Sequence, residues 1–229
     1  MSPVPALSAD LVRAFAQRMS AVSAVLLDAH AGTSDGEAGD LLELIVASVR
    51  GSMVDRKSVW LLLTALHGAM PTSSEVIEAA RMLELEDAVT SALWLLDRAH
   101  EVILDRGNPL SEIDLVRGAV VVDVTQTARS DQHAGIQRVV RQTLPYWHES
   151  RAILLASWTS NGGSLRRLTE SEEQAVLHWD DCAGGAIPNR AALSDRRIPE
   201  RLLIPWDSVI MLPEVPTAGR CPQLAALAE

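Results

Sequence analysis

Residues 118–147 read GAVVVDVTQTARSDQHAGIQRVVRQTLPYW, and this stretch decides the fold that we expect for the second half of the chain. Valines occupy positions 120–122 and 124 and predict a β-strand over 119–124. A polar loop follows and ends at Gly135. Apolar residues then recur with the period of a helix over 135–148, at Ile136, Val139, Val140 and Leu144. A strand, a loop with a glycine and a helix form the opening unit of a doubly wound α/β domain.

The loop after this strand is a candidate site for an anionic ligand. A helix that begins beside the carboxyl end of a strand presents unpaired N–H groups and the positive end of its dipole. Arg138, one turn into the helix, adds a charged fork that suits phosphate. The loop has a single glycine, Gly135, where a dinucleotide-binding loop has three. Two interpretations therefore stay open: an anion site, and a plain strand-to-helix turn.

Two segments of the second half resemble a known enzyme family. Residues 123–129 (DVTQTAR) and 134–144 (AGIQRVVRQTL) resemble the start of the catalytic region in bacterial glycosyltransferases of the GT-B class, of the family-four-like, mannosyltransferase type. Residues 202–229 are similar to the segment that follows in that group, with a Pro-Trp-Asp turn, an apolar strand and a Pro-Glu pair that ends at Glu214. The resemblance covers residues 118–229, about half of the chain.

The resemblance implies an activity and a set of ligand contacts. The activity is transfer of a hexosyl group from a nucleotide sugar to a glycan or a lipid-linked acceptor. Gly135 would let the ligand approach the backbone, and Arg138 would face a phosphate or the acceptor. Asp123, at the strand end, is a candidate polar contact, and its alternative role is a carboxylate that caps the loop. The resemblance gives Glu214 no role.

The resemblance also implies an incomplete fold. We expect residues 110–229 to form a partial Rossmann-like α/β domain, equivalent to the N-terminal domain of a GT-B enzyme. In that class the nucleotide sugar is held mainly by a second domain that carries a pair of glutamates, and the 229 residues contain no counterpart of it. We therefore expect the N-terminal portion of a longer enzyme, inactive alone.

Residues 1–109 show the pattern of a helical bundle, with five amphipathic segments joined by short connections. Thr72 and Glu75 form a capping-box pattern ahead of the fourth segment. The fifth segment is expected to bury the apolar residues Val89, Ala92, Leu96, Ala99 and Ile103. Two roles stay open for the bundle: a docking or oligomerisation module, and a module that only packs on the catalytic domain. A non-catalytic interaction protein built on this bundle is the alternative function.

The rest of the second half is expected to alternate between short strands and loops. Residues 110–117 are predicted as a linker and 153–158 as the second strand. Residues 161–163 indicate a hairpin turn, and a helix is expected from Thr169. Residues 180–200 have the composition of a loop. Two further strands, 202–204 and 208–212, precede a last helix capped by Thr217.

Composition excludes several classes of function. The net charge is −10, with −7 in residues 1–110 and −3 in 111–229, so nucleic acid is not an expected partner. Two cysteines, Cys182 and Cys221, are too few for a disulfide framework. His178, Asp180, Asp181 and Cys182 lack metal-ligand spacing, so no metal or cofactor is expected. Neither a signal peptide nor a transmembrane segment is predicted. We expect a cytoplasmic protein, with peripheral contact at the inner membrane as the second option for the intact enzyme.

Overall fold

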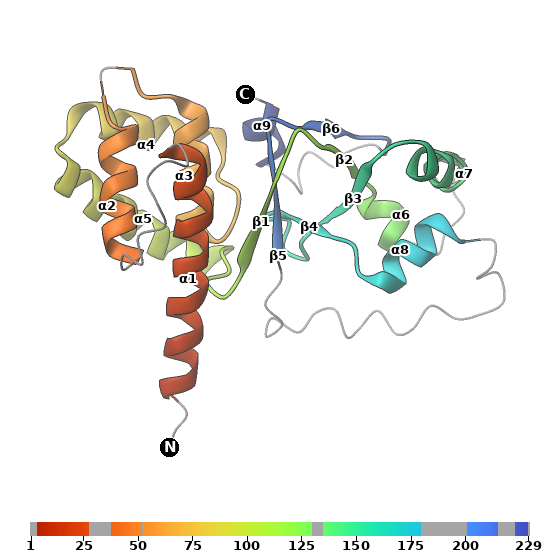
Figure 1. The fold of residues 1–229 in the computed structure, drawn as a ribbon, viewed down its shortest axis with the longest axis horizontal. Coiled ribbons are helices and arrows are strands. Elements are labelled where there is room, and N and C mark those ends of the chain that lie inside the picture. The colour runs from red at the N-terminus through yellow and green to blue at the C-terminus, as the bar shows by residue number, and fades with distance from the viewer. Residues whose placement is uncertain are drawn as a thin grey trace. The chain divides into compact units, whose positions relative to one another are not determined.

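The computed structural model describes residues 4–27, 38–51, 53–129, 135–179, 201–214 and 223–228 (Figure 1). The chain divides into two compact units: unit 1 is Met1–Ile113 with Cys221–Glu229, and unit 2 is Asp114–Arg220. The boundary predicted after residue 109 lies close to this division. The last helix, which the sequence assigns to the second domain, groups with unit 1. Residues 180–200, Thr217 and both cysteines lie outside the described residues.

Unit 1 is helical, and polar caps define where three of its helices begin. Asp55 accepts hydrogen bonds from the first turn of α3, and Asp87 does the same for α5. The predicted capping box of Thr72 and Glu75 is confirmed at the start of α4. The helices are α1 (Val4–Leu26), α2 (Ala38–Val49), α3 (Arg56–His67), α4 (Ser73–Leu85), α5 (Ala88–Asp105) and α9 (Gln223–Ala228). Every residue of α3 from Val59 to His67 is buried, so this helix is the centre of the unit.

A buried arginine ties α1 to the end of the helical segment. Arg18 donates to the carbonyl oxygens of Ala65 at 2.6 Å, Pro109 at 2.8 Å and Ser111 at 2.7 Å. Burial lowers the pKa of its guanidinium to about 10. These three bonds join α1, the end of α3 and the segment after α5, because the guanidinium is the shared donor. The side chain is therefore part of the framework of unit 1.

The buried face of α5 differs from the predicted one. Ser91, Leu95, Ala99 and Val102 are buried, whereas Val89 and Leu96 are exposed. The two apolar rows lie on different faces of the same helix, and the sequence period fits both. The row that contains the small residues Ser91 and Ala99 faces α2, α3 and α4. The predicted core role of Val89 and Leu96 is wrong.

Unit 2 is built on a mixed six-stranded sheet with strand order β1-β5-β4-β3-β2-β6. Its strands are β1 (Glu112–Arg117), β2 (Val120–Asp123), β3 (Ile153–Trp158), β4 (Leu165–Arg167), β5 (Arg201–Trp206) and β6 (Val209–Met211). β2 pairs in parallel with β3 and β6, whereas β4 is antiparallel to β3 and β5. The predicted hairpin turn is confirmed, with Gly162 at φ 70° between β3 and β4. The linker predicted over 110–117 is wrong, because most of it forms β1, whose polar and apolar residues alternate at Glu112–Leu115.

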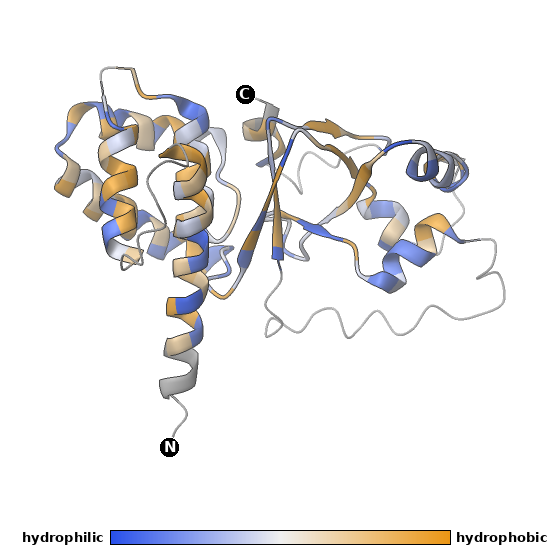
Figure 2. Ribbon diagram, viewed as in Figure 1, coloured by the Kyte–Doolittle hydropathy of each residue, from blue (hydrophilic) through white to orange (hydrophobic). Residues whose placement is uncertain are grey.

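Three helices, α6 (Thr125–Arg129), α7 (Gly135–Ser150) and α8 (Glu170–Leu177), lie on one face of this sheet (Figure 1). Strands β2 and β3 are hydrophobic along most of their length (Figure 2). Val122 and Leu155 of the sheet pack with Val140 of α7 and Val176 of α8. On α7, Gln137 and Arg141 are buried together with Val140 and Leu144, whereas Ile136 and Val139 are exposed. The helix therefore turns a partly polar face inward, which its apolar pattern does not predict.

Candidate functional site

The carboxyl ends of three parallel strands meet at one edge of the sheet of unit 2. β2 ends at Asp123, β3 ends at Trp158, and Glu214 follows shortly after β6. In α/β sheets this edge is where ligands bind, because loops and helix N-termini gather there. Each of the three residues is buried. We therefore take this edge as the candidate site.

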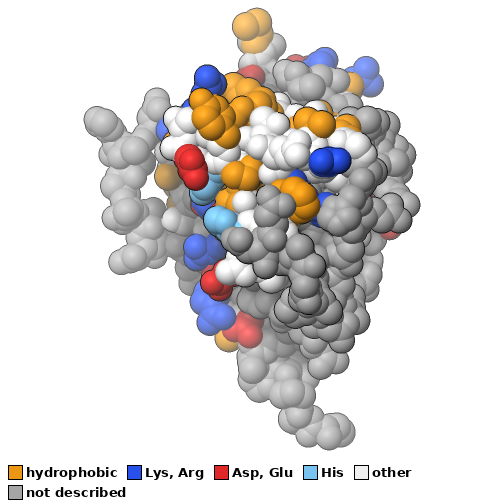
Figure 3. Space-filling view, turned by 90° about the vertical axis from the view of Figure 1, so that its right-hand side faces the viewer, with side chains coloured by type: hydrophobic (Ala, Val, Ile, Leu, Met, Phe, Trp, Pro, Cys, Tyr) orange, Lys and Arg blue, Asp and Glu red, His pale blue; other side chains and the backbone are white. Residues whose placement is uncertain are grey.

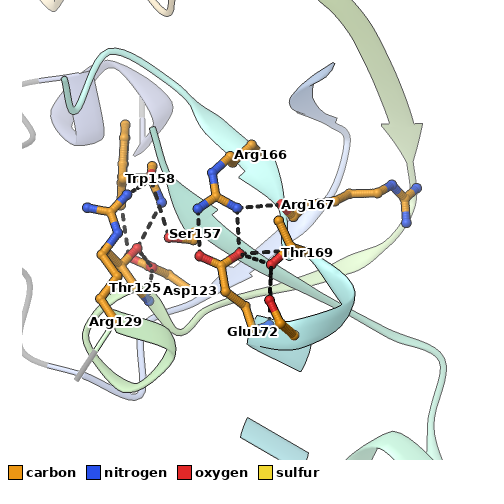
Figure 4. Close-up of polar contacts among 10 residues, drawn as sticks. Asp123, Thr125, Arg129, Ser157, Trp158, Arg166, Arg167, Thr169 and Glu172 are labelled. Atoms are coloured by element: carbon orange, nitrogen blue, oxygen red, sulfur yellow. Dashed lines mark hydrogen bonds and ion pairs between the residues drawn. The ribbon is translucent and has the colours of Figure 1, made fainter. Parts of the chain in front are cut away.

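Asp123 is the centre of a network of short hydrogen bonds (Figure 4). Its Oδ1 accepts from the backbone N of Thr125 at 3.0 Å and from Thr125 Oγ1 at 2.5 Å. Its Oδ2 accepts from the indole Nε1 of Trp158 at 3.0 Å. Thr125 Oγ1 accepts in turn from the backbone N of Trp158 at 2.8 Å. The network holds the end of β2 against the end of β3, so Asp123 has the loop-capping geometry that was one of its two expected roles.

Glu214 closes the beginning of α6. Its Oε2 accepts from the backbone N of Gln126 and its Oε1 from the backbone N of Thr127, both at 2.7 Å. Asp123 binds the N–H of Thr125, and the first intrahelical bond joins Ala128 N to Val124 O. Two carboxylates thus satisfy the first three N–H groups of this helix. The sequence predicts a polar loop here, so α6 is an unpredicted helix, and the chain's own carboxylates bind its first N–H groups.

The buried position of Glu214 is unfavourable for the charged form of its carboxyl group. The pKa of its carboxyl lies above the ordinary value because burial outweighs the hydrogen bonds from Thr127 and Gln126. The nearby charge of Asp123 acts in the same direction as burial. The positive end of the short helix α6 offers a partial compensation. Glu214 is therefore a buried carboxyl group whose charged form is disfavoured at the site.

Two arginines add positive charge around α6. Arg129, the last residue of α6, donates from Nη2 to the carbonyl oxygen of Trp158 (Figure 4). Arg141, buried on α7, donates from Nη2 to the carbonyl oxygen of Thr127 at 3.2 Å. Both guanidinium groups bind backbone oxygen at the carboxyl edge of the sheet. They join α6 to β3 and to α7.

A buried ion pair lies beside this network on β4 and α8 (Figure 4). Arg166 makes two parallel bonds to Glu172, Nη1 to Oε2 and Nη2 to Oε1, each 2.7 Å long. Glu172 also accepts from the backbone N of Thr169 at 2.9 Å, which completes the capping box of α8. Although burial acts to raise it, the pKa of Glu172 is held below its ordinary value by these bonds from Arg166 and Thr169. The pair fixes α8 on the sheet.

Gly135 and Arg138 lie apart from the Asp123 network, on the exposed side of the first turns of α7. A Cβ built on Gly135 meets no atom within 4 Å, so the glycine is not required by close packing against the described residues. Arg138 forms no hydrogen bond or ion pair within the part of the chain that the structure describes. On the face of unit 2 that carries α7 and α8, hydrophobic side chains lie among arginine and histidine side chains (Figure 3). Of the three residues predicted for the site, Asp123 alone is buried at the sheet edge.

Sequence reasoning left Arg129, Arg141 and Trp158 out of the site. Trp158 is 3% exposed, so its ring is a packing and hydrogen-bonding group and does not present a face for stacking on a sugar. The Pro-Glu pair that ends at Glu214 was the available signal for the closure of α6. Its function requires the pairing of β6 with β2, which the local pattern does not reveal.

The comparisons with known proteins give no further identification. No protein-family model matches the chain, and neither a curated protein nor a solved structure is significantly similar to it. Within the described residues, no three His, Cys, Asp or Glu side chains are grouped so as to hold a metal ion. None of the described helices combines the length and the apolar character that crossing a membrane requires.

Proposed function

We propose that unit 2 is the acceptor-side domain of a glycosyltransferase of the GT-B class. The proposed reaction transfers a hexosyl group from a nucleotide sugar to a glycan or a lipid-linked acceptor. One observation carries the proposal. The two segments that resemble this class are far apart in the sequence, yet they are paired: β2 lies beside β6, and Glu214 of the second segment binds the N–H groups of α6 in the first.

Within this proposal the buried carboxylates are positioning residues. Asp123 and Glu214 occupy the N–H groups of α6, so this helix has no free N–H group for a substrate phosphate. The first turn of α7 is the remaining helix start in the same segment, and its Gly135 and Arg138 are exposed. We assign ligand contact to these two residues. Arg138 would supply the positive charge that a phosphate or a departing diphosphate requires.

Ligand titrations followed by two-dimensional NMR on the labelled chain test the proposal. The ligands are uridine and guanosine diphosphate hexoses and a panel of hexose oligosaccharides. We expect at least one of them to shift the amide signals of Gly135 and Arg138 and to leave those of the buried α3 unchanged. Arg138→Ala should weaken this binding about ten- to a hundredfold, the value of a charge-assisted hydrogen bond.

The matched control is Arg151→Ala, which removes an equal exposed charge just beyond the other end of α7. Its affinity for the same ligand should equal that of the wild type. If Arg138→Ala and Arg151→Ala both bind the ligand as tightly as the wild type, the start of α7 is not part of the site. Because unit 2 is proposed as the acceptor side, a complete lack of response to the hexose oligosaccharides would contradict the assignment of unit 2 to this class.

A further inference from the structure

Helix α5 of unit 1 carries an apolar row on its outer side. Val89, Leu93 and Leu96 follow each other at helical spacing, the exposed His100 comes one turn later, and Leu104 follows one turn after it. The residues that face the unit are on the opposite side of the helix, from Ser91 to Val102. The exposed fractions are 70% for Val89, 64% for Leu93, 42% for Leu96 and 74% for Leu104. We call these four residues the α5 row.

The α5 row groups four large, exposed apolar residues on one side of a single helix. Leu85, the last residue of α4, is also 79% exposed and precedes the row in the sequence. A surface helix normally places charged residues on the side away from its core. Contiguous exposed apolar residues with a polar border are typical of protein interaction sites. The row is therefore a candidate interaction surface.

A negative border runs along the α5 row. Asp97, Glu101 and Asp105 recur every fourth residue and are exposed, so they form a second row one step around the helix. Arg98 forms an ion pair with Glu101, whereas Asp97 and Asp105 have no ion pair among the described residues. At the amino end of α5 the exposed carboxylates of Glu86 and Asp87 lie beside Arg50, which donates to the carbonyl oxygen of Glu86. This surface is thus apolar along its centre and acidic along its side.

We propose that the α5 row binds an amphipathic helix of a partner protein that carries leucine-like residues on one face and lysines or arginines beside them. The spacing of the row fits the apolar face of a helix. The acidic border selects a basic flank by charge complementarity. A second copy of this chain would bring the same acidic residues against them, since residues 1–110 have a net charge of −7. An anionic lipid surface is disfavoured for the same reason.

The test uses the full chain and a synthetic helical peptide of about 18 residues, or five helical turns. The peptide has leucines on one face and lysines beside them, and a control peptide has glutamates in place of the lysines. We expect the lysine peptide to bind and the glutamate peptide not to bind. The double variant Leu93→Glu, Leu96→Glu should weaken binding at least tenfold. The double variant Asp97→Asn, Asp105→Asn should weaken it less and reduce its dependence on salt.

The control variant Val12→Glu, Leu44→Glu carries the same change at exposed apolar positions of α1 and α2, and it should bind like the wild type. Circular dichroism of each variant shows whether the helices are retained. Equal binding of both peptides, or unchanged binding by a folded Leu93→Glu, Leu96→Glu chain, would overturn the proposal. A dimer in sedimentation that this variant dissociates, or vesicle binding that it abolishes, would assign the row to a second copy or to lipid instead and would also overturn it.

Discussion

Glu214 Oε1 accepts a hydrogen bond from the backbone N of Thr127 at 2.7 Å across 87 residues of sequence. The neighbouring oxygen of the same carboxylate binds the N–H of Gln126. The end of one parallel strand therefore determines the start of the helix that follows another. This contact joins the two segments on which the proposed function depends.

Glu214→Ala is expected to lower the free energy of unfolding by about 1.5–3 kcal/mol, because it leaves the buried N–H of Thr127 and the part-buried N–H of Gln126 without an acceptor. Urea denaturation followed by tryptophan fluorescence measures this change. Glu149→Ala removes an exposed carboxylate from α7 and should change stability by less than about 0.5 kcal/mol. Equal urea midpoints for Glu214→Ala and the wild type would show that α6 does not depend on this carboxylate.

The stability of unit 1 is expected to fall in mild acid because of His67. Burial lowers the pKa of its imidazole to about 4, with smaller effects from Glu75, Arg106 and Arg98. The folded unit prefers neutral His67, so its contribution is complete above the unfolded pKa of about 6.5 and is lost as the pH falls toward 4. The pKa difference corresponds to about 3 kcal/mol. Melting temperatures measured between pH 7 and pH 5 follow the onset of this loss.

Two histidine variants isolate this effect from the titration of carboxylates. His67→Leu keeps an apolar side chain in the buried position and should lose most of the pH dependence between pH 7 and pH 5. His100→Gln changes an exposed histidine on α5 and should keep the pH dependence of stability. The assignment of the pH dependence to His67 is wrong when both variants behave like the wild type.

Gly135→Ala separates binding from stability at the start of α7. The added methyl group meets no described atom within 4 Å, and alanine favours helix, so we expect the free energy of unfolding to rise by about 0.4–1 kcal/mol. If a ligand lies against this backbone, the same variant should bind it more weakly. Thermal melting and the NMR titration on one sample give both values. A lower stability of Gly135→Ala would mean that the backbone conformation of the turn requires a glycine at this position.

Residues 1–113 are expected to fold alone as a helical domain, and a fragment that ends at residue 107 should be less stable. The shorter fragment lacks Pro109 and Ser111, which supply two of the three carbonyl acceptors of the buried Arg18. We expect a difference of about 1–3 kcal/mol between the two fragments. Far-UV circular dichroism during heating measures it. Identical melting curves would contradict the role assigned to Arg18.

The sequence predicts elements that depend on neighbouring residues. The valines of β2, the capping box at Thr72, the helix start at Thr169 and the turn at Gly162 are each encoded within a few positions. The inward face of α7 could not be predicted, because Gln137 and Arg141 are polar and Arg141 is buried against a carbonyl oxygen of α6. The face of α5 was misassigned because two apolar rows share its period.

The candidate site was predictable only in part, since its geometry comes from residues distant in sequence. Asp123 can be located from the end of its strand. The closure of α6 by Glu214 requires the parallel pairing of β2 and β6, and the indole partner of Asp123 requires the pairing of β2 and β3. Strand pairing between distant segments is the information that single-sequence patterns lack.

The position of β2 between β3 and β6 also matters while the chain is being made. Its partner β3 follows after the two helices α6 and α7, but β6 comes only after residue 208. A ribosome-bound chain therefore exposes one edge of a valine-rich strand until residues 209–211 have been made. Open, apolar strand edges pair with other chains, so nascent chains on crowded polysomes are at risk of aggregation during this interval.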